Sequence, residues 1–411
     1  MGPVAPRGHL PGDLDPAVGG GQDLRRDPRA QPGRPAGRQR AHHRRKGPAV
    51  GRPVNVGVVG CGAISAQYFQ TIDRLPQLRL VAVADLDLDR AREAVRPYAG
   101  VDVVSVADLL ADPRVDVVLN LTIPAAHAEI ALQAIAAGKD VYCEKPLAAT
   151  AEDAGRMLRA AGEAGVRVGC APDTVLGTGT QTARKAIDDG LIGRPVAATA
   201  TMMTPGHERW HPNPDFYYVP GGGPLLDMGP YYVTSLVTLL GPVTTVIGAA
   251  SRTRAKRTIG SGPRRGEDIP VTVDTHVTGV LVHDSGALST LVMSFDAAAT
   301  KAPNIEVHGE AGSLVVPDPN RFDGSVLLSQ VGEQGWRELP VSAGYAEGGR
   351  GVGLADFTAT PAGEEPRTSG SLAYHVLDVM ESLLASAGSG TAVSITSTCE
   401  RPSPVLLQPG G

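Results

Sequence analysis

The chain has 411 residues, 42% of them hydrophobic, which is enough apolar material for two domains with cores of their own. The formal net charge is −5, but residues 1–52 hold eleven Lys/Arg and four Asp/Glu, so this segment carries +7 (11 − 4) and the remainder −12 (−5 − 7). An acidic body disfavours nucleic acid as a partner. No apolar run reaches the roughly 18 residues of a membrane-spanning helix, so we expect no membrane partner either.

Residues 1–52 are rich in Pro, Gly and Arg and almost lack long apolar side chains. Such a segment cannot bury enough surface to offset the entropy of ordering it, so we predict a disordered basic tail. A nucleic-acid-binding arm is one interpretation. An upstream extension without function, from a start misassigned just before Val54, is the other, and the composition favours it because charge runs are usually solvated.

The four cysteines point to a reducing compartment. Cys61, Cys143, Cys170 and Cys399 form no Cys-x-x-Cys pair, and three of them stand in apolar runs. This pattern is typical of buried thiols in a cytoplasmic protein and disfavours both a disulfide framework and a zinc site. We therefore expect a cytoplasmic protein without a metal.

A glycine-rich turn opens the first predicted domain, residues 53–172. The short β-branched run 54–59 predicts a strand, and Gly60-Cys61-Gly62-Ala63-Ile64-Ser65 follows it and opens a helix to about Arg74. A Gly-x-Gly turn lets the backbone approach a pyrophosphate, and the helix behind it offers N–H groups and a positive dipole end. Ser65 takes the place of a third glycine and is still small enough for close packing. The motif is weak alone, but its place between strand and helix supports a dinucleotide site.

Asp85 ends the second predicted strand, residues 80–84. A carboxylate at this place accepts hydrogen bonds from the adenosine ribose and repels a 2′-phosphate, so it favours NAD, with NADP as the runner-up. Leu86 follows, where an Arg or Ser would welcome that phosphate. A cap for the helix that begins after Asp87 is a compatible structural interpretation.

Further strands and helices alternate up to residue 170 and predict a doubly wound parallel sheet. Lys145 follows the strand 141–143 directly, in the run Glu144-Lys145-Pro146. Ligands of open α/β sheets lie outside the carboxyl ends of the strands, so Lys145 stands where chemistry is expected. The other predicted elements are strands 101–104, 115–121 and 166–170 and helices 128–137 and 152–164.

A loop over residues 204–218 concentrates aromatic and imidazole side chains in a chain with only 4% aromatics. Its prolines forbid regular structure, so we interpret it as a wall of the substrate pocket that includes His207, Trp210 and His211. A packed loop without ligand contact is the alternative. The His207-x-x-x-His211 spacing suits a metal only on a helix, which the prolines and Gly206 exclude.

The predicted helix 225–240 carries Asp227 and Tyr231, which are four residues apart and share a face. Both can therefore point together into a cleft, although Asp227 as a dipole partner and Tyr231 as a core residue is the structural alternative. His375, on the predicted helix 371–387, either reaches the pocket or packs. We also predict helix 179–190, strands 195–203, 243–251, 271–283, 286–295, 304–308 and 313–316, and a frayed end at 398–411.

Together these motifs resemble the Gfo/Idh/MocA family of nicotinamide-dependent sugar and polyol oxidoreductases. The matching segments are 60–65, Asp85, the turn 124–127, Glu144-Lys145-Pro146 and 222–231. The resemblance implies a second α/β domain, residues 173–397, with a large open, mainly antiparallel sheet that forms a homodimer or homotetramer contact. It implies a cofactor site made of Gly60, Gly62, Ala63, Ile64, Asp85, Thr122, Pro124, His127, Glu144 and Lys145. With the loop and helix residues singled out above, the predicted substrate site consists of Lys145, Asp173, His207, Trp210, His211, Asp227, Tyr231 and His375.

The chain departs from the family pattern at two places. Many members have His where this chain has Tyr231, and the tyrosine resembles the branch with glucose-fructose oxidoreductase and dihydrodiol dehydrogenase; Asp173-Thr174 stands where many have Asn-Arg. Lys145, Tyr231 and Asp227 are the catalytic candidates. We expect a lysine with a lowered pKa that serves as base or orients one, and a tyrosine whose phenolate Lys145 favours; which of the three takes the proton stays open. The expected reaction is hydride transfer between nicotinamide and a sugar, polyol or cyclitol. The alternatives are redox-assisted glycoside cleavage and a non-catalytic nucleotide sensor.

Overall fold

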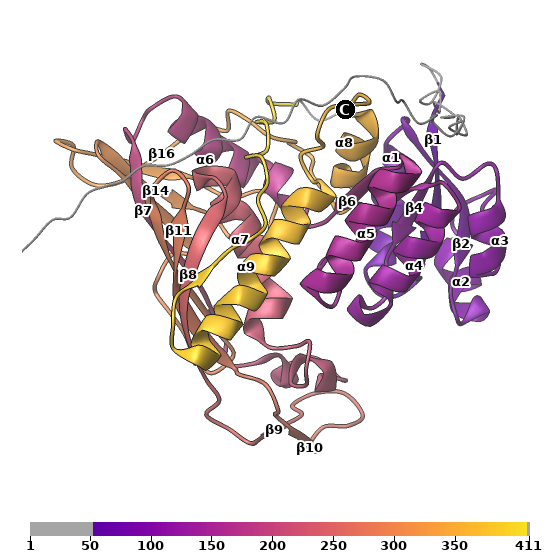
Figure 1. Cartoon of the computed structure of the whole chain (residues 1–411), viewed down its shortest axis with the longest axis horizontal. Coiled ribbons are helices and arrows are strands. Elements are labelled where there is room, and N and C mark those ends of the chain that lie inside the picture. Colours follow the sequence, from indigo (N-terminus) through magenta and orange to yellow (C-terminus); the bar gives the residue numbers. More distant parts are fainter. Residues whose placement is uncertain (1–51, 409–411) are drawn as a thin grey trace, which may run out of the picture. The chain divides into compact units, whose positions relative to one another are not determined.

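Two β-sheets organise residues 52–408, the part of the chain that the computed structural model describes (Figure 1). The predictions for residues 1–51 and 409–411 lie outside the described residues. No helix within 52–408 has both the length and the apolar character needed to cross a bilayer.

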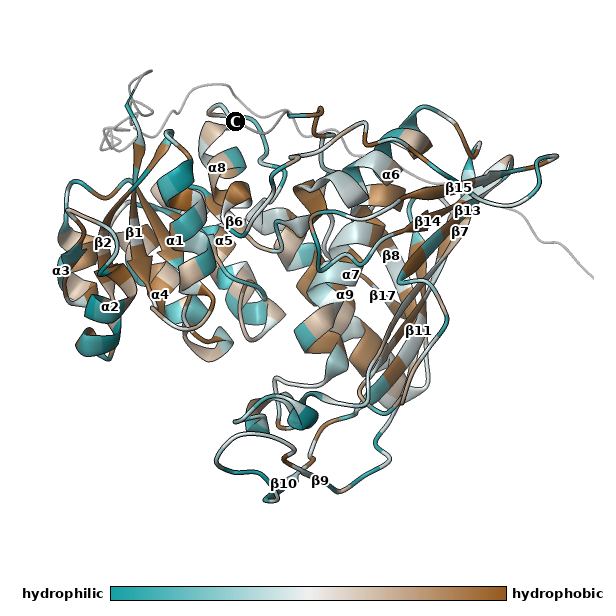
Figure 2. Cartoon of the chain, turned by 180° about the vertical axis from the view of Figure 1, so that it is seen from behind, coloured by the Kyte–Doolittle hydropathy of each residue, from teal (hydrophilic) through white to brown (hydrophobic). Residues whose placement is uncertain are grey.

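The first sheet has six strands in the order β3-β2-β1-β4-β5-β6, all parallel. Its central strands are Val-rich and buried, as a sheet covered on both faces requires, and they appear as a brown layer in Figure 2. The strand order reverses between β1 and β4, and the crevice at such a reversal is where α/β proteins bind nucleotides. The strands are β1 (Val54–Val59), β2 (Leu78–Ala84), β3 (Asp102–Val103), β4 (Val117–Asn120), β5 (Asp140–Cys143) and β6 (Val168–Cys170). The predicted doubly wound sheet is confirmed.

Five helices connect these strands, and most begin at a side-chain cap. Asp87, not Asp85, caps α2 by accepting from the N–H groups of Asp89 and Arg90, and Thr150 caps α5 by accepting from that of Asp153. The helices are α1 (Ser65–Arg74), α2 (Leu88–Val95), α3 (Val106–Ala111), α4 (Pro124–Ala136) and α5 (Ala151–Ala164).

The second sheet has nine strands in the order β16-β15-β14-β13-β7-β12-β11-β8-β17. Only the β7–β12 pair is parallel, so the expected large, mainly antiparallel sheet is confirmed. Its strands are β7 (Pro195–Met203), β8 (Val243–Ser251), β11 (His276–His283), β12 (Leu288–Ser294), β13 (Ile305–Gly309), β14 (Gly312–Val316), β15 (Leu327–Gln330), β16 (Arg337–Glu338) and β17 (Val393–Ser394). A separate hairpin is formed by β9 (Lys256–Thr258) and β10 (Asp268–Pro270).

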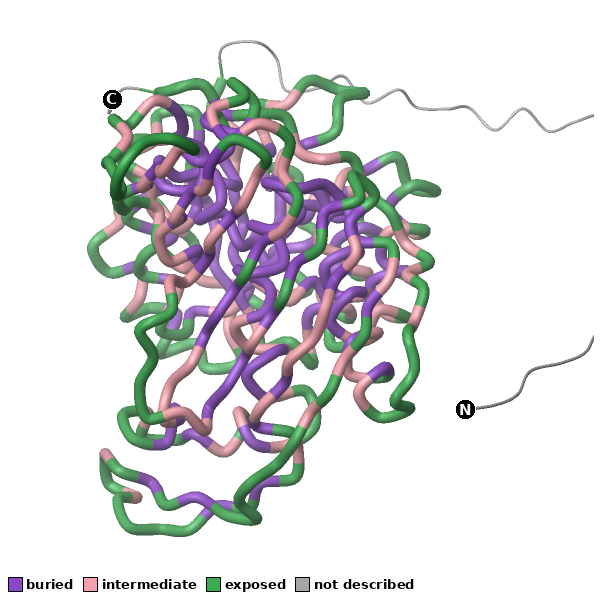
Figure 3. The backbone as a smooth tube through the Cα atoms, turned by 90° about the vertical axis from the view of Figure 1, so that its left-hand side faces the viewer, coloured by how far each residue is buried: buried purple, intermediate pink, exposed green. Residues whose placement is uncertain are grey.

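Helices α6 (Thr178–Asp188), α7 (Pro224–Leu240) and α9 (Gly370–Ser389) accompany the second sheet, and α7 and α9 pack on its strands (Figure 1). Burial is concentrated where these helices meet the sheet, whereas the β9–β10 region is largely exposed (Figure 3). Helix α8 (Val352–Ala359) returns to the first sheet, where Phe357 packs edge-on against Tyr142. The first sheet lies within 53–172 and the second within 173–397, but the described residues form one compact unit, so the division into domains stays a prediction.

The prediction of a frayed end from residue 398 is wrong for 398–408. Arg401 donates to the carbonyl oxygens of Thr238 and Leu239, in the last turn of α7, and forms an ion pair with Asp188. These carbonyls have no partner within the helix, so an arginine is well suited to cap them. Val405 is buried in a small core beyond this cap. Arg184 and Arg367 also donate to carbonyl oxygens of residues 402–404. The Pro- and Ser-rich composition did not reveal this because the partners are remote in the chain.

Candidate functional site

The glycine turn after β1 is shaped for close approach of a ligand. Gly60 has φ +101°, and a Cβ there would lie 2.7 Å from the carbonyl oxygen of Leu121, so only glycine fits. A Cβ at Gly62 would meet nothing within 4 Å, which leaves the backbone open on that side. Asp85 holds the turn, since its Oδ2 accepts from the N–H of Cys61 at 2.7 Å. The turn and the start of α1 therefore fit a pyrophosphate.

Two exposed apolar side chains stand beside this turn, Leu86 and Ile123, and the sequence had drawn attention only to Leu86. Leu86 follows Asp85 after β2, and Ile123 follows Thr122 after β4. Arg90 lies 3.8 Å from Asp85 Oδ1 and partly balances its charge. The signal for both is a large apolar residue just past a strand end, where ligands of open α/β sheets bind.

His127 is fully buried, so the expectation that it contacts the cofactor directly needs correction. Its Nδ1 lies 2.7 Å from the carbonyl oxygen of Pro146 and its Nε2 lies 2.9 Å from that of Thr122. Burial lowers the pKa of this histidine, although both carbonyls oppose the shift. The imidazole therefore ties the loop after β4 to the loop after β5.

Glu144 fixes the turn that presents Lys145. Its Oε1 accepts from the hydroxyl of Tyr68 on α1 at 2.8 Å, and its Oε2 accepts from the backbone N–H of Lys145 at 2.8 Å. The Lys145–Pro146 peptide bond is cis. Glu144 is itself buried, so it positions the turn and offers little surface to a ligand.

The amine of Lys145 reaches helix α7. Its Nζ donates to the backbone oxygen of Asp227 at 2.6 Å and to Asp227 Oδ1 at 3.2 Å. Burial alone would lower the pKa of Lys145, but the negative charge of Asp227, with smaller contributions from Tyr231 and Glu144, outweighs burial and raises it. The expected lowering is therefore wrong, and Lys145 is an ammonium ion. Burial would raise the pKa of Asp227, but Lys145 and His207 lower it, so the pair is ionised.

Tyr231 lies beside Lys145, one helical turn after Asp227, as the spacing predicts. The Lys145 Nζ is 5.1 Å from the centre of the tyrosine ring. Burial raises the pKa of Tyr231 more than Lys145 and Arg350 lower it. Lys145 thus favours the phenolate as expected, but burial prevails and Tyr231 carries its hydrogen in this state.

His207 contacts Asp227 from the loop after β7. Its Nε2 lies 3.1 Å from Asp227 Oδ2, so the carboxylate bridges Lys145 and His207. The imidazole packs against the rings of Phe295, Tyr217 and Trp210 at centroid distances of 4.4, 4.7 and 5.2 Å. The predicted pocket-wall residue His207 is thus paired with Asp227 through Nε2.

A buried ion network holds this loop in place. Arg257, from β9, has a side chain 1% exposed and donates to Glu208 Oε1 at 2.8 Å and to Asp296 Oδ1 at 2.5 Å. Glu208 also accepts from the Tyr218 hydroxyl, which in turn accepts from the N–H of His207 at 3.1 Å. The position of His207 therefore depends on a short hairpin that the sequence pattern did not predict.

Trp210 and His211 lie further out on the same loop. Trp210 is exposed, and His211 packs edge-on against Phe216 and Tyr217 and accepts from the N–H of Asn213 through Nδ1. Within residues 52–408, no group of three or more His, Cys, Asp or Glu side chains is arranged to hold a metal ion.

Two predicted substrate residues lie in the core instead. Asp173 is fully buried, and its Oδ2 accepts from the N–H groups of Gly351 and Gly353. His375 is also fully buried: its Nε2 accepts from the N–H of Val243 and its Nδ1 lies 3.0 Å from Ser397 Oγ. Both expectations are corrected, because all ring and carboxylate surface faces protein.

Arg350 is a site residue that the sequence analysis missed. Its Nη2 donates to the Tyr231 hydroxyl at 3.3 Å and to Asn320 Oδ1 at 2.7 Å, and its guanidinium lies 5.2 Å from the tyrosine ring centre. It stands in the glycine-rich stretch 348–353, far along the chain from every motif, so only the tertiary structure reveals it.

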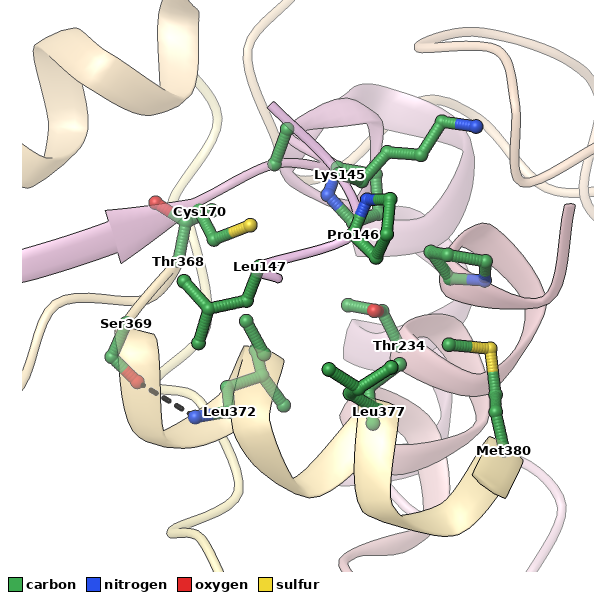
Figure 4. Close-up of a pocket in the computed structure, with 15 residues that line it drawn as sticks. Lys145, Pro146, Leu147, Cys170, Thr234, Thr368, Ser369, Leu372, Leu377 and Met380 are labelled. Carbon is green, nitrogen blue, oxygen red and sulfur yellow. Dashed lines mark hydrogen bonds between the residues drawn. The ribbon is translucent and has the colours of Figure 1, made fainter. Parts of the chain in front are cut away.

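A small apolar cavity lies behind Lys145, between the end of the first sheet and helices α7 and α9 (Figure 4). Its volume of about 10 Å³ is at the limit for a single water molecule, far below the size of a sugar ring. Figure 4 shows the amine of Lys145 pointing away from the apolar side chains of Leu147, Leu372, Leu377 and Met380. The amine of Lys145 lies instead beside Asp227 and the ring of Tyr231.

Comparison with known proteins agrees with this geometry. A family model described as an oxidoreductase family with an NAD-binding Rossmann fold matches residues 54–171, and the GFO/IDH/MocA C-terminal domain model matches residues 180–315. A 1,5-anhydro-D-fructose reductase from Ensifer adhaerens is 33% identical over 266 residues, 63% of this chain and 74% of that protein. A myo-inositol 2-dehydrogenase from Thermotoga maritima is 28% identical over 288 residues, 70% of this chain and 81% of that protein.

A solved structure shares the fold over most of the chain. The NAD binding oxidoreductase from Klebsiella pneumoniae superposes with a TM-score of 0.73 at 25% identity, covering 84% of this chain and 100% of that one. The two family models therefore assign this chain to one family, and the strand order of both sheets agrees with them. This chain belongs to the Gfo/Idh/MocA family of oxidoreductases and carries that family's NAD-binding Rossmann domain.

Proposed function

We propose that this protein transfers a hydride between NAD and a CH–OH or C=O carbon of a sugar, polyol or cyclitol, at Lys145, Asp227 and Tyr231. The observation that carries the proposal is the contact of Lys145 with Asp227, which places a fixed ammonium and a neutral phenol beside the carboxyl ends of the nucleotide-binding strands. The reductase and the inositol dehydrogenase named above act on such hydroxylated carbons, which supports this substrate class.

The residues around the glycine turn suit NAD. Gly60 and Gly62 leave room for the pyrophosphate, Asp85 suits the ribose hydroxyls, and Leu86 and Ile123 offer apolar contact to the adenine. When bound, the nicotinamide accepts or supplies the hydride. The protein contributes position, charge and proton transfer.

Lys145 would bind the reacting oxygen as a charged donor. An ammonium has three N–H groups, and two of them go to Asp227 oxygens, which leaves one for the substrate. Its charge stabilises the negative charge that develops on that oxygen in the transition state. Asp227 keeps the lysine charged and oriented, so its role is to support Lys145 and not to accept the proton.

Tyr231 would exchange the proton with the reacting oxygen. Its hydroxyl hydrogen is available in the reducing direction, and the same oxygen receives the proton in the oxidising direction. The exposed rings of Trp210 and Phe216, with the half-buried Tyr217, offer flat apolar surfaces suited to the C–H face of a sugar ring.

The direct test is a panel of sugars, inositols and dihydrodiols, each incubated with NAD or NADP and followed by absorbance of the reduced cofactor. We expect reduction of NAD by at least one cyclic polyol or sugar. Binding of NADH together with no oxidation or reduction across the panel would contradict the proposal.

We propose in addition that copies of the chain associate through the outer face of the nine-stranded sheet. Helices α7 and α9 pack on one face, whereas Ile247 and Leu288 on the strands remain exposed, near half-buried valines of β11. Light scattering after size exclusion should give a dimer or tetramer. The Ile247→Glu variant should be a monomer. A wild-type protein that is already a monomer would contradict the proposal.

We further propose a cytoplasmic location. All four cysteines are free, with Cys61, Cys143 and Cys170 buried, which suits a reducing compartment. Fractionation of cells that express the full chain should recover it in the cytoplasmic fraction, and recovery from the periplasm or the medium would overturn this.

A further inference from the structure

The hydroxyl of Tyr231 has one protein partner, and that partner donates. Arg350 Nη2 lies 3.3 Å from the Tyr231 oxygen. A guanidinium has five N–H donors and no acceptor, so the tyrosine oxygen must accept. Among residues 52–408, no acceptor lies against the tyrosine's own hydrogen. This hydrogen is therefore available to a ligand; His207 Nδ1 and Arg350 Nη1 are also buried here without a hydrogen-bond partner in the described part of the chain.

From this geometry we infer that Arg350 is a positioning residue that turns the Tyr231 hydrogen towards the reacting oxygen of the substrate. The inference rests on the proposed function, because it needs a substrate oxygen beside Lys145. Without Arg350 the hydroxyl would rotate freely and could donate elsewhere. With Arg350 in place, the lone pair facing the arginine is occupied and the hydrogen is directed to the remaining side.

Arg350 is held firmly enough to act in this way. The two hydrogens of Nη2 go to Tyr231 and to Asn320 Oδ1, the latter at 2.7 Å. Nη1 faces Asp173 Oδ1 at 3.7 Å, and the same carboxylate binds the N–H groups of Gly351 and Gly353 through Oδ2. The arginine side chain is 11% exposed and Asp173 is fully buried, so neither is free to swing into solvent.

The positive charge of Arg350 has a second effect on Tyr231. The Lys145 amine lies 5.1 Å from the centre of the phenol ring, and the Arg350 guanidinium lies 5.2 Å from it. Both cations oppose the effect of burial on the pKa of Tyr231, although burial prevails in the resting site. When the proton leaves, the positive charges of Lys145 and Arg350 stabilise the negative charge of the Tyr231 phenolate.

Reduction of the substrate moves one hydride to carbon and one proton to oxygen. The substrate carbon gains the hydride, with its electron pair, from the reduced nicotinamide, and the C=O π bond opens. The carbonyl oxygen takes the proton of Tyr231, so one O–H bond forms and one breaks. The tyrosine is left as a phenolate that accepts from Arg350 Nη2 and regains a proton from water. Oxidation runs through the same steps in reverse.

The test compares Arg350→Met and Arg350→Lys with Arg321→Met, a matched loss of an exposed arginine next to Asn320. We expect Arg350→Met to lower kcat by about tenfold to a hundredfold, with KM and NADH affinity little changed. Arg350→Lys should recover part of this loss. The control should retain wild-type kcat.

A readout that needs no substrate separates positioning from a structural role. The ultraviolet titration of tyrosinate, taken as the difference between each enzyme and its Tyr231→Phe partner, isolates Tyr231. Loss of the cation in Arg350→Met should raise this pKa by about one unit or more, and Arg350→Lys should restore it in part. An unchanged Tyr231 titration, or unchanged kcat, in a folded Arg350→Met enzyme would overturn the inference.

Asn320→Ala provides a second variant if Arg350→Met does not fold. It removes the acceptor of one Nη2 hydrogen bond and keeps the charge of Arg350. We expect a few-fold loss of kcat, which Arg321→Met should not show. Full wild-type activity of Asn320→Ala would count against the inference. If the wild type turns over no sugar or polyol, the proposed function fails, yet the tyrosinate titration still reports whether Arg350 controls Tyr231.

Discussion

The cofactor side of the site is built from the ends of neighbouring parallel strands, whereas the substrate side is built from one helix and two loops that are far apart in the chain. On the cofactor side, Gly60 and Asp85 follow directly after strands of the first sheet, and Thr122 stands two residues after the end of β4. On the substrate side, His207, Tyr231 and Arg350 come from separate segments and meet only through packing. Lys145 joins the two sides through Asp227.

This difference explains which groups are exposed and which are paired. The glycine turn is open at Gly62, and Leu86 and Ile123 are exposed beside it. These residues are positioned by the backbone pairing of their strands, so their side chains need no protein partner. The substrate side is densely paired, because each of its charged side chains is brought into a poorly solvated site and must find a partner there. We therefore expect changes on the two sides to have different effects.

The largest effect is expected where the two sides meet. Lys145→Met removes the charged donor to the reacting oxygen and should lower kcat by about 10²- to 10⁴-fold, while leaving the glycine turn and NADH affinity intact. Steady-state kinetics and fluorescence titration of NADH measure the two quantities. Lys185→Met, on the surface of α6, is the control. A turnover close to wild type would remove Lys145 from the mechanism.

The substrate side should also depend on a remote ion network. Arg257→Met leaves Glu208 and Asp296 buried without their partner and should lower the free energy of unfolding by about 3–5 kcal/mol. Chemical denaturation measures this, and the loss of ordered His207 should also lower kcat. Arg264→Met, in an exposed pair with Asp215, should change stability little. Equal effects of both substitutions would mean that the network does not hold the loop.

The pH dependence offers a finer test of Asp227. Burial favours the uncharged lysine, and Asp227 is the main group that reverses this and raises the pKa of Lys145. In the wild type the lysine therefore stays charged beyond its ordinary pKa of about 10.4. In Asp227→Asn burial prevails, so the alkaline limit of kcat should move to lower pH. Profiles of kcat against pH for both proteins test this, and an unmoved limit would show that Asp227 does not control Lys145.

The smallest effect is expected on the cofactor side. Asp85→Ser removes the carboxylate that suits the ribose and should weaken NAD binding about tenfold, or about 1.4 kcal/mol, and improve NADP binding relative to NAD. At saturating cofactor kcat should stay close to wild type, because Asp85 is remote from Lys145 along the strand ends. Asp73→Ser, an exposed acid of α1, is the control. A large fall in kcat at saturation would break the distinction between the two sides.

Much of the cofactor side of the site could be predicted from local sequence. The glycine turn, Asp85 and the Glu144-Lys145-Pro146 run could be placed because each follows a short buried strand, and the strand order of a doubly wound sheet brings such ends together. The four-residue spacing of Asp227 and Tyr231 likewise requires only that their segment be helical. The short strands β9, β10, β15, β16 and β17 were missed, because two to four residues carry no detectable alternation.

The sequence by itself thus determined the order of the elements, the nucleotide-binding turn and the side chains that a helix or strand presents together. The tertiary structure alone decided which of them ionise and which face the substrate. Asp173 and His375 are polar residues near motifs, yet packing buries both. Burial alone would lower the pKa of Lys145, but Asp227 lies within hydrogen-bond distance and raises it. Asp227 stands 82 residues later in the chain. Arg350 reaches Tyr231 from 119 residues away. Such contacts depend on distances in space between segments remote in sequence, and no local pattern of residues records them.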